Sequence, residues 1–145
     1  MTQEEKELLL KDLCARLPYG VIVKVSKEDN GSIKSYDKSF DAKTYQLLLL
    51  NGGYLERGIM YHYPQFSLKP YLRPMSSMTE EEVKELAYKI LLQPDLNVVK
   101  NYKTLDISFT DLDKVMNWLN EHHFDYRGLI EKGLALETTE DMYKN

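Results

Sequence analysis

The sequence predicts an α+β fold: a small antiparallel meandering sheet with an N-terminal helix and two further main helices in the C-terminal half. Strand-like segments follow one another in the first half with short turns between them, as an antiparallel meander requires. Helical apolar spacing appears at the N-terminus and then mostly in the second half. No linker or repeat divides the 145 residues, so we expect one domain over residues 1–136 and a polar, frayed tail over 137–145.

The first helix is predicted to end near Arg16. Thr2 and Glu5 form a capping box, which satisfies free amides at a helix start, and Pro18 cannot continue the helix. Apolar residues recur at helical spacing and are expected to face the core, namely Leu9, Leu10, Leu13, Cys14 and Leu17. We therefore interpret the lone thiol as core filling rather than as a nucleophile.

A hairpin is expected next. Three alternating valines, at positions 21, 23 and 25, line one face of a strand. Asn30-Gly31 is the predicted turn, although the polar residues before it suggest a longer loop. The return strand around Ile33 to Tyr36 is polar enough to lie at a sheet edge.

Further strands are predicted up to Leu72. Residues 44–50 end in four leucines and indicate a central strand, which Asn51-Gly52-Gly53 ends. Shorter strands are expected over Gly58 to His62 and Ser67 to Leu72. Prolines confine these short pieces to edges, at Pro64, Pro70 and Pro74.

The second half predicts two main helices. Thr79 and Glu82 form a second capping box, and the apolar face that follows comprises Val83, Leu86, Ala87, Ile90 and Leu91. Residues 98–107 are expected to hold one or two short strands. The third helix begins at Thr110 and ends near His122 or His123, with an apolar face of Leu112, Val115, Met116 and Leu119.

A last short helix is expected after these elements. Asp125 is a candidate N-cap for a helix through Leu129 and Ile130, and Gly133 would close it. An extended apolar piece then covers residues 134–136.

Composition narrows the functional classes. The chain has 19 Lys and Arg against 23 Asp and Glu, and the net charge of −4 argues against general polyanion binding. A single cysteine, an acidic N-terminus without signal-peptide features and short apolar runs lead us to expect a cytoplasmic protein without membrane contact. No Gly-rich phosphate loop, paired-cysteine metal site or nucleophile elbow is present, so no cofactor or metal is expected.

Two clusters carry candidate chemistry. The segment 54–73 combines tyrosines with cations and carries a charge of +2, and its candidate partner-binding residues are Tyr54, Arg57, Tyr61, His62, Tyr63, Tyr71 and Arg73. The alternative is an aromatic sheet edge whose rings are buried. In the second cluster, His122, His123 and Arg127 are candidates for binding an anion, or else the imidazoles interact with a helix C-terminus.

Three stretches carry a resemblance to a known family: residues 17–20 (LPYG), 71–82 (YLRPMSSMTEEE) and 118–136 (WLNEHHFDYRGLIEKGLAL). Together they resemble a family of short uncharacterised proteins encoded by Bacteroides-type gut anaerobes and their prophages. That family has no established activity, so the resemblance assigns no catalytic residue. It implies a cytoplasmic accessory protein of a mobile element or of its bacterial host.

Three functions follow, in order of preference. The first is a non-enzymatic interaction module that binds a protein partner or a second copy of itself. The second is a nucleic-acid-binding accessory protein, which the acidic remainder of the chain opposes. The third is a small hydrolase-like enzyme in which His122 or His123 acts as acid or base and Arg127 holds an anionic substrate.

Overall fold

A computed structural model gives the structure of the chain, and it describes residues 1–40, 66–91 and 109–143. Within these ranges, helices and a sheet share the chain, and the α+β class is confirmed. None of the described helices combines the length and the apolar character that crossing a membrane requires.

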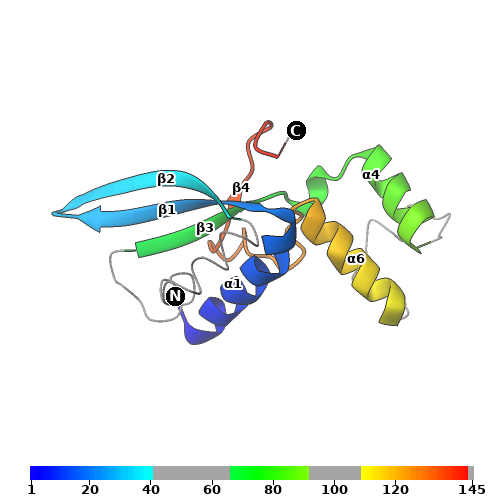
Figure 1. The fold of residues 1–145 in the computed structure, drawn as a ribbon, viewed down its shortest axis with the longest axis horizontal. Helices are drawn as coiled ribbons and strands as arrows, with labels where there is room; N and C mark the ends of the chain where they lie inside the picture. The colour runs from blue at the N-terminus through cyan, green and yellow to red at the C-terminus, as the bar shows by residue number, and fades with distance from the viewer. Residues whose placement is uncertain (41–65, 92–108, 144–145) are drawn as a thin grey trace.

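Three helices surround one end of a long sheet (Figure 1). Helix α1 (Gln3–Arg16) lies below the sheet, whereas α4 (Glu80–Glu85) and α6 (Phe109–Glu121) lie beyond its right-hand end in this view. A π-helical turn, Leu86–Leu91, continues α4. The predicted N-terminal helix and both later helices are therefore present.

The sheet contains β1 (Val21–Asp29), β2 (Ser32–Phe40), β3 (Phe66–Leu72) and β4 (Leu136–Glu137), in the order β2-β1-β3-β4. Strand β1 is antiparallel to both neighbours, but β3 and β4 are parallel. The sheet is mixed, so the purely antiparallel meander was wrong. The reason is that β4 follows β3 only after α4 and α6, and this long connection returns the chain in the same direction.

The β1–β2 hairpin is longer and tighter than expected. Its register runs without a bulge from Val21 opposite Phe40 to Asp29 opposite Ser32. Asn30 (φ 50°) and Gly31 (φ 79°) form a two-residue turn of the kind that needs positive φ at both positions. The longer loop suggested by the polar residues was therefore wrong, and the edge position of the return strand is confirmed.

The sheet and α1 share a hydrophobic core. The three predicted valines of β1 are buried, and they pack in one cluster with apolar residues of α1, β2 and β3, including Leu9, Leu13, Leu17, Phe40 and Leu68. Cys14 is exposed, which corrects its predicted place in the stripe. Successive helix residues point about 100° apart, and α1 instead turns Asp12 and Arg16 toward the interior.

A second core joins α4 to α6. The predicted capping box is present: the Glu82 amide donates to the Thr79 hydroxyl at 3.2 Å, and the Thr79 amide donates to the Glu82 carboxylate at 2.9 Å. Buried apolar residues of this core are Val83, Leu86, Ala87, Val115, Trp118, Leu119, Phe124 and Tyr126. Leu112, assigned to the apolar face of α6, is 42% exposed.

Pro70 lies in β3, whose far side pairs with β4 only at Tyr71 and Leu72. Within the described residues Pro70 therefore has a strand partner on one side alone, as its predicted edge position requires. Neighbouring residues of a strand turn their amides to opposite sides. Because the Ile22 amide points toward β3, the Val23 amide points away from it, so Val23 and Pro70 pair without exchanging hydrogen bonds. The missing proline N–H therefore costs β1 no ladder bond. The strands expected over 44–50, 58–62 and 98–107, like Pro64, lie outside the described residues.

The chain after α6 is fixed by side chains. Asp125 accepts hydrogen bonds from the amides of Leu129 and Ile130, both at 2.8 Å, within a series of turns rather than the expected short helix. The polar tail is held at Tyr143, whose hydroxyl accepts from the Ile22 amide at 3.0 Å and donates to the Tyr71 carbonyl at 2.8 Å. This hydroxyl bridges β1 and β3 just beyond their last paired residues.

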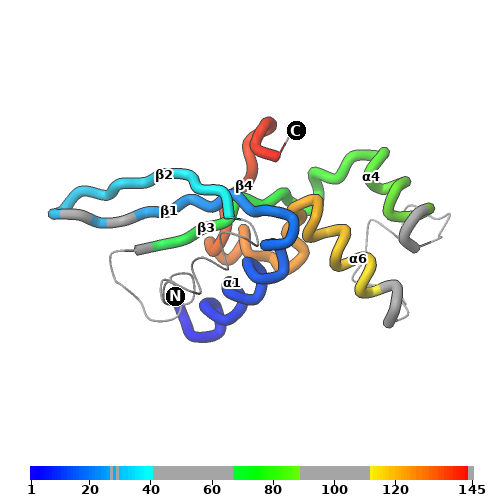
Figure 2. Tube along the Cα trace, in the orientation of Figure 1, coloured from blue at the N-terminus to red at the C-terminus, as the bar shows by residue number. Residues whose placement is uncertain are grey.

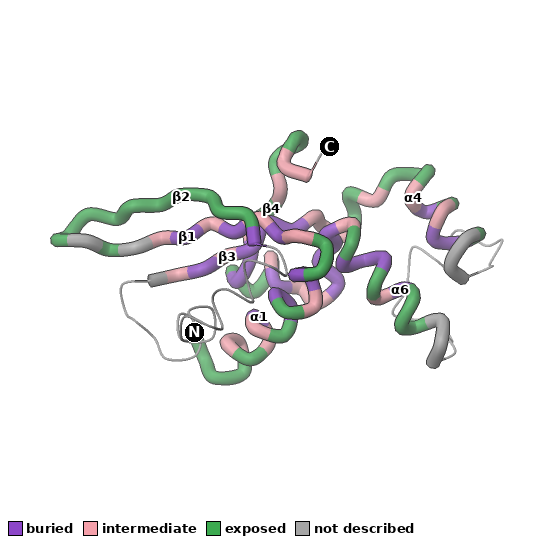
Figure 3. The backbone as a smooth tube through the Cα atoms, in the orientation of Figure 1, coloured by how far each residue is buried: buried purple, intermediate pink, exposed green. Residues whose placement is uncertain are grey.

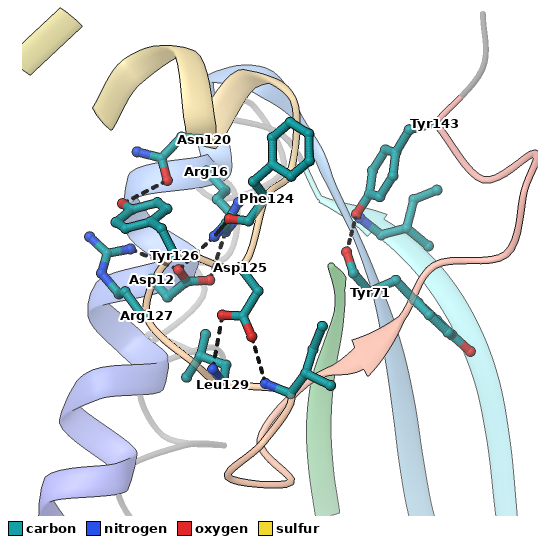
Figure 4. A network of polar contacts seen from close by, with 12 residues as sticks. Asp12, Arg16, Tyr71, Asn120, Phe124, Asp125, Tyr126, Arg127, Leu129 and Tyr143 are labelled. Carbon is teal, nitrogen blue, oxygen red and sulfur yellow. Dashed lines mark hydrogen bonds and ion pairs between the residues drawn. The ribbon is translucent and has the colours of Figure 1, made fainter. Parts of the chain in front are cut away.

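A buried charge network joins α1 to the chain after α6 (Figure 4). Asp12 and Arg16 have no exposed surface, and their side chains form a bidentate ion pair at 2.7 and 2.9 Å. Arg127 donates to the same carboxylate at 2.7 Å, and Arg16 donates to the Phe124 carbonyl at 2.8 Å. One carboxylate therefore holds two guanidiniums, and through them two distant parts of the chain.

Replacing Asp12 should reduce stability strongly. Asp12→Ala leaves the buried Arg16 without its counter-ion, and losing one partner of a buried pair costs about 3–5 kcal/mol. Urea unfolding followed by circular dichroism measures this loss. Glu7→Ala removes an exposed carboxylate from the same helix and should change stability by less than about 0.5 kcal/mol. Equal effects of the two substitutions would contradict the structural role of Asp12.

Candidate functional site

The predicted aromatic contact surface is only partly described. Five of its residues, Tyr54, Arg57, Tyr61, His62 and Tyr63, lie outside the described ranges. Tyr71 is only 8% exposed, and its hydroxyl donates to Asp37 at 2.9 Å. Arg73 forms an ion pair with Glu82 at 2.6 Å, and its guanidinium lies 4.2 Å from the centre of the Phe124 ring. Tyr71 and Arg73 are therefore engaged within the fold rather than presented to solvent.

The three residues of the predicted anion site have different partners in the fold. Arg127 is turned toward Asp12, at 2.7 Å, and its guanidinium lies 4.6 Å from the centre of the Tyr126 ring. The two histidines also stack on different aromatic rings. The His122 ring stacks on Trp118 with centroids 4.0 Å apart, whereas the His123 ring stacks on Tyr143 at 3.5 Å. Arg127 thus contacts other groups than the imidazoles that were expected to share a ligand with it.

A backbone reversal at His123 ends α6. The His123 amide donates to the Asn120 carbonyl at 3.1 Å, and the Phe124 amide donates to the Leu119 carbonyl at 2.9 Å. These two bonds are those of a Schellman motif, whose reversing residue needs positive φ and is usually glycine. His123 has φ 61°, which carries a conformational cost for a residue with a side chain.

His123 is held as a neutral imidazole. It is only 6% exposed, and burial is the largest cause that lowers its pKa from 6.5 to about 4. The positive charges of Arg16, His122 and Arg73 lower the pKa further, and Asp12 opposes them. A helix C-terminus favours an imidazolium, but burial and the nearby cations outweigh that effect here. The Nδ1 atom of His123 is buried without a hydrogen-bond partner in the described structure.

A pocket opens beside these histidines, with a volume of about 580 Å³. Its lining comes from the corner between α1 and β1 at Tyr19, from Arg73 after β3, from Glu82 on α4 and from the end of α6 at Glu121. The tail closes another side with Tyr143. Volumes of this size are typical of small-molecule sites, so the pocket is a candidate ligand site.

The outer edge of the sheet is a second candidate surface. Strand β2 is exposed from Ser32 through Ser39 and is buried only at Phe40 (Figure 3). Two large apolar side chains lie on it, Ile33 at 75% exposure and Tyr36 at 56%. Figure 2 shows the hairpin extending well away from α4 and α6. A long exposed edge strand is a template for pairing with another chain.

Sequence patterns could locate only some of these residues. The capping box identified Glu82, and the helix end identified both histidines. Tyr143 was missed because it lies in a polar tail, although an isolated aromatic residue there was a usable signal. The pairing of Asp12 with Arg16 at helical spacing was a further signal for a salt bridge. Within the described ranges, no group of three or more metal-ligating side chains could hold a metal ion.

Replacing His123 should change the acid stability of the fold. In the folded protein its pKa is about 4, below the 6.5 of the unfolded chain, so the unfolded state binds more protons between these values. The contribution is fully present above pH 6.5 and is lost as the pH falls toward 4. Its upper limit is about 3.5 kcal/mol, because each tenfold change in a protonation constant corresponds to about 1.4 kcal/mol.

The variant His123→Asn tests this prediction, because asparagine accepts positive φ and does not titrate in this range. The free energy of unfolding, measured with urea at pH 7.5 and at pH 4.5, should fall less for the variant than for the wild type. An equal fall in both proteins would show that other groups cause the acid sensitivity.

The comparisons with known proteins provide no relative from which a function could be transferred. The chain matches no protein-family model, no curated protein and no solved structure. The family resemblance of its sequence stays a prediction.

Proposed function

We propose that this protein is a non-enzymatic interaction module that binds an extended, acidic segment of a partner protein along the outer edge of β2. The observation that carries the proposal is the uninterrupted exposure of this edge strand from Ser32 through Ser39. Addition of a strand to an exposed sheet edge is a recurring mode of peptide recognition.

The hairpin register identifies the main-chain groups available to a partner. Residues that flank a two-residue turn exchange both hydrogen bonds, and the pattern then alternates along the strands. Lys34, Tyr36 and Lys38 therefore bond to β1. The amides and carbonyls that point outward belong to Ile33, Ser35, Asp37 and Ser39. These groups form a continuous row that an added strand can pair with.

The side chains favour an acidic partner. Tyr36 and Lys38 pair with core valines of β1 and so lie on the core-side face of β2, and Lys34 shares this face because side chains alternate along a strand. All three are exposed. An added strand would place its own side chains beside them, and opposite charges in such cross-strand pairs are stabilising. Carboxylates flanking an apolar residue therefore complement this row.

A second copy of the chain fits this edge less well. Two copies overlap most when their β2 strands pair antiparallel with the two Tyr36 residues opposite one another. In this register Lys34 of each copy would lie opposite Lys38 of the other. Like charges directly opposite one another are destabilising. We therefore favour a different protein over self-association.

Nucleic acid is the alternative partner for the same row, because two cations flanking an aromatic ring also suit single strands. The net charge of −4 opposes it, since phosphate contacts dominate the affinity of nucleic-acid-binding proteins. An enzyme that pairs the histidines with Arg127 has less support, because Arg127 is bound to Asp12. The accessory role in a bacterium or its mobile element depends on the family resemblance alone.

Binding of a labelled peptide tests the proposal. The probe is a peptide as long as β2 in which glutamate alternates with valine, and its binding is followed by fluorescence anisotropy. Ser35→Pro removes an outward amide, so it should weaken binding by about tenfold or more while the hairpin ladder stays intact. Ser35→Ala is the matched control, because it removes only the hydroxyl that bonds Ser26, and should change affinity by less than about threefold.

Circular dichroism and urea unfolding check that both variants are folded. A peptide of alternating lysine and valine should bind at least about tenfold more weakly than the acidic peptide. Equal affinities of the two Ser35 variants would exclude strand addition at this edge. Tighter binding of a single-stranded oligonucleotide than of the acidic peptide would favour the nucleic-acid alternative.

A further inference from the structure

The pocket at the end of α6 has a chemistry that the peptide-binding proposal does not use. Its charged lining residues are Arg73, Glu82 and Glu121. Arg73 donates to both carboxylate oxygens of Glu82, at 2.6 and 2.8 Å, so these two charges neutralise each other. The guanidinium also lowers the pKa of Glu82, against the opposing effect of burial, which keeps that carboxylate ionised.

Of the carboxylates and guanidiniums that line the pocket, Glu121 is the one outside this ion pair. Glu121 is exposed, and it forms no ion pair with the part of the chain that the structure describes. It belongs to the last turn of α6, at the negative end of the helix dipole, although the Leu119 and Asn120 carbonyls of this turn accept bonds from Phe124 and His123. Because His123 is neutral above a pKa of about 4, it adds no compensating positive charge. The pocket therefore favours a cation over an anion.

Aromatic rings and hydrogen-bond acceptors line the same space. Tyr19 and Tyr143 contribute rings, whose faces attract cations. His122 directs Nδ1 to the Trp118 carbonyl at 2.9 Å, so in the neutral ring Nδ1 is the donor and Nε2 is an acceptor. Carboxylate, imidazole and ring faces together suit a ligand that carries N–H donors on an apolar body.

His123 provides independent evidence that the pocket is a functional site. It lines the pocket, is 6% exposed, and its Nδ1 atom lacks a hydrogen-bond partner in the described structure. An unsatisfied buried polar atom and a positive φ both reduce stability. Such features concentrate at functional sites, and here they lie together under the ring of Tyr143.

We propose that this pocket binds a small organic cation, with a guanidinium or alkylammonium group directed to Glu121 and its apolar part against the aromatic rings. The site meets the outer edge of β2, which the acidic peptide would occupy, only at Ser39. Ser39 is the lining residue that β2 contributes, and Ser35 does not line the pocket.

Titration with three small probes tests the proposal. Butylguanidinium presents a guanidinium, butylammonium presents an ammonium group, and butyrate is an anionic control of similar size. Affinities are measured by isothermal titration calorimetry, and two-dimensional NMR follows the backbone amides of Gly20, His122 and Tyr143. We expect saturable binding of at least one cation with shifts at these amides, and no binding of butyrate. The ratio of the two cation affinities identifies the preferred group.

Two variants that change the net charge equally distinguish the effect of a local contact on cation affinity from the effect of net charge. Glu121→Gln should weaken cation binding about tenfold or more, because it removes the ionised partner in the pocket. Glu131→Gln removes an exposed carboxylate that does not line the pocket, and it should leave affinity within about twofold.

Equal weakening by both substitutions, binding of butyrate as tight as that of the cations, or no binding of either cation would overturn the proposal. None of these results depends on peptide binding at β2. The Ser35 variants should bind the cation as the wild type does, so failure of one proposal is distinguishable from failure of the other.

Discussion

The buried carboxylate of Asp12 is the constraint on which the arrangement of this protein depends. It binds the guanidiniums of Arg16 and Arg127, and Arg16 binds the Phe124 carbonyl (Figure 4). Burying two positive charges beside one negative charge is costly, and it is tolerated only where the geometry satisfies most donors. The contacts fix α1 against the chain that leaves α6. The position of that chain then determines where His123 and the pocket lie.

The C-terminal tail also holds the end of α6 in place, through contacts of Tyr143 with the sheet and with His123. The hydroxyl of Tyr143 connects the Ile22 amide to the Tyr71 carbonyl, and its ring covers His123. The tail therefore links the sheet to the helix end. It also keeps the imidazole away from water, and this burial is the main reason that its pKa is low. Fold stability, histidine protonation and pocket shape consequently depend on one set of contacts.

The two candidate surfaces differ in what they offer a ligand. The edge of β2 offers main-chain hydrogen bonds over an extended strand and a row of positive charge, so it suits a long acidic segment. The pocket offers a negative helix end, a carboxylate and aromatic rings within about 580 Å³, so it suits a small cation. The two proposed sites therefore differ in the charge of the ligand that each would favour.

The sequence by itself determined the local elements: both capping boxes, the three helices, the buried valine face of β1 and the edge position of β2. These features depend on neighbours in the chain, through hydrogen bonds over three residues or alternation along a strand. Only the tertiary structure decided the parallel β3–β4 pair, the inward turn of Asp12 and Arg16, the separation of Arg127 from the histidines and the docking of Tyr143. The β3–β4 pair, the contact of Arg127 with Asp12 and the docking of Tyr143 join residues far apart in sequence, and the energy of such contacts depends on burial and charge that no local pattern encodes.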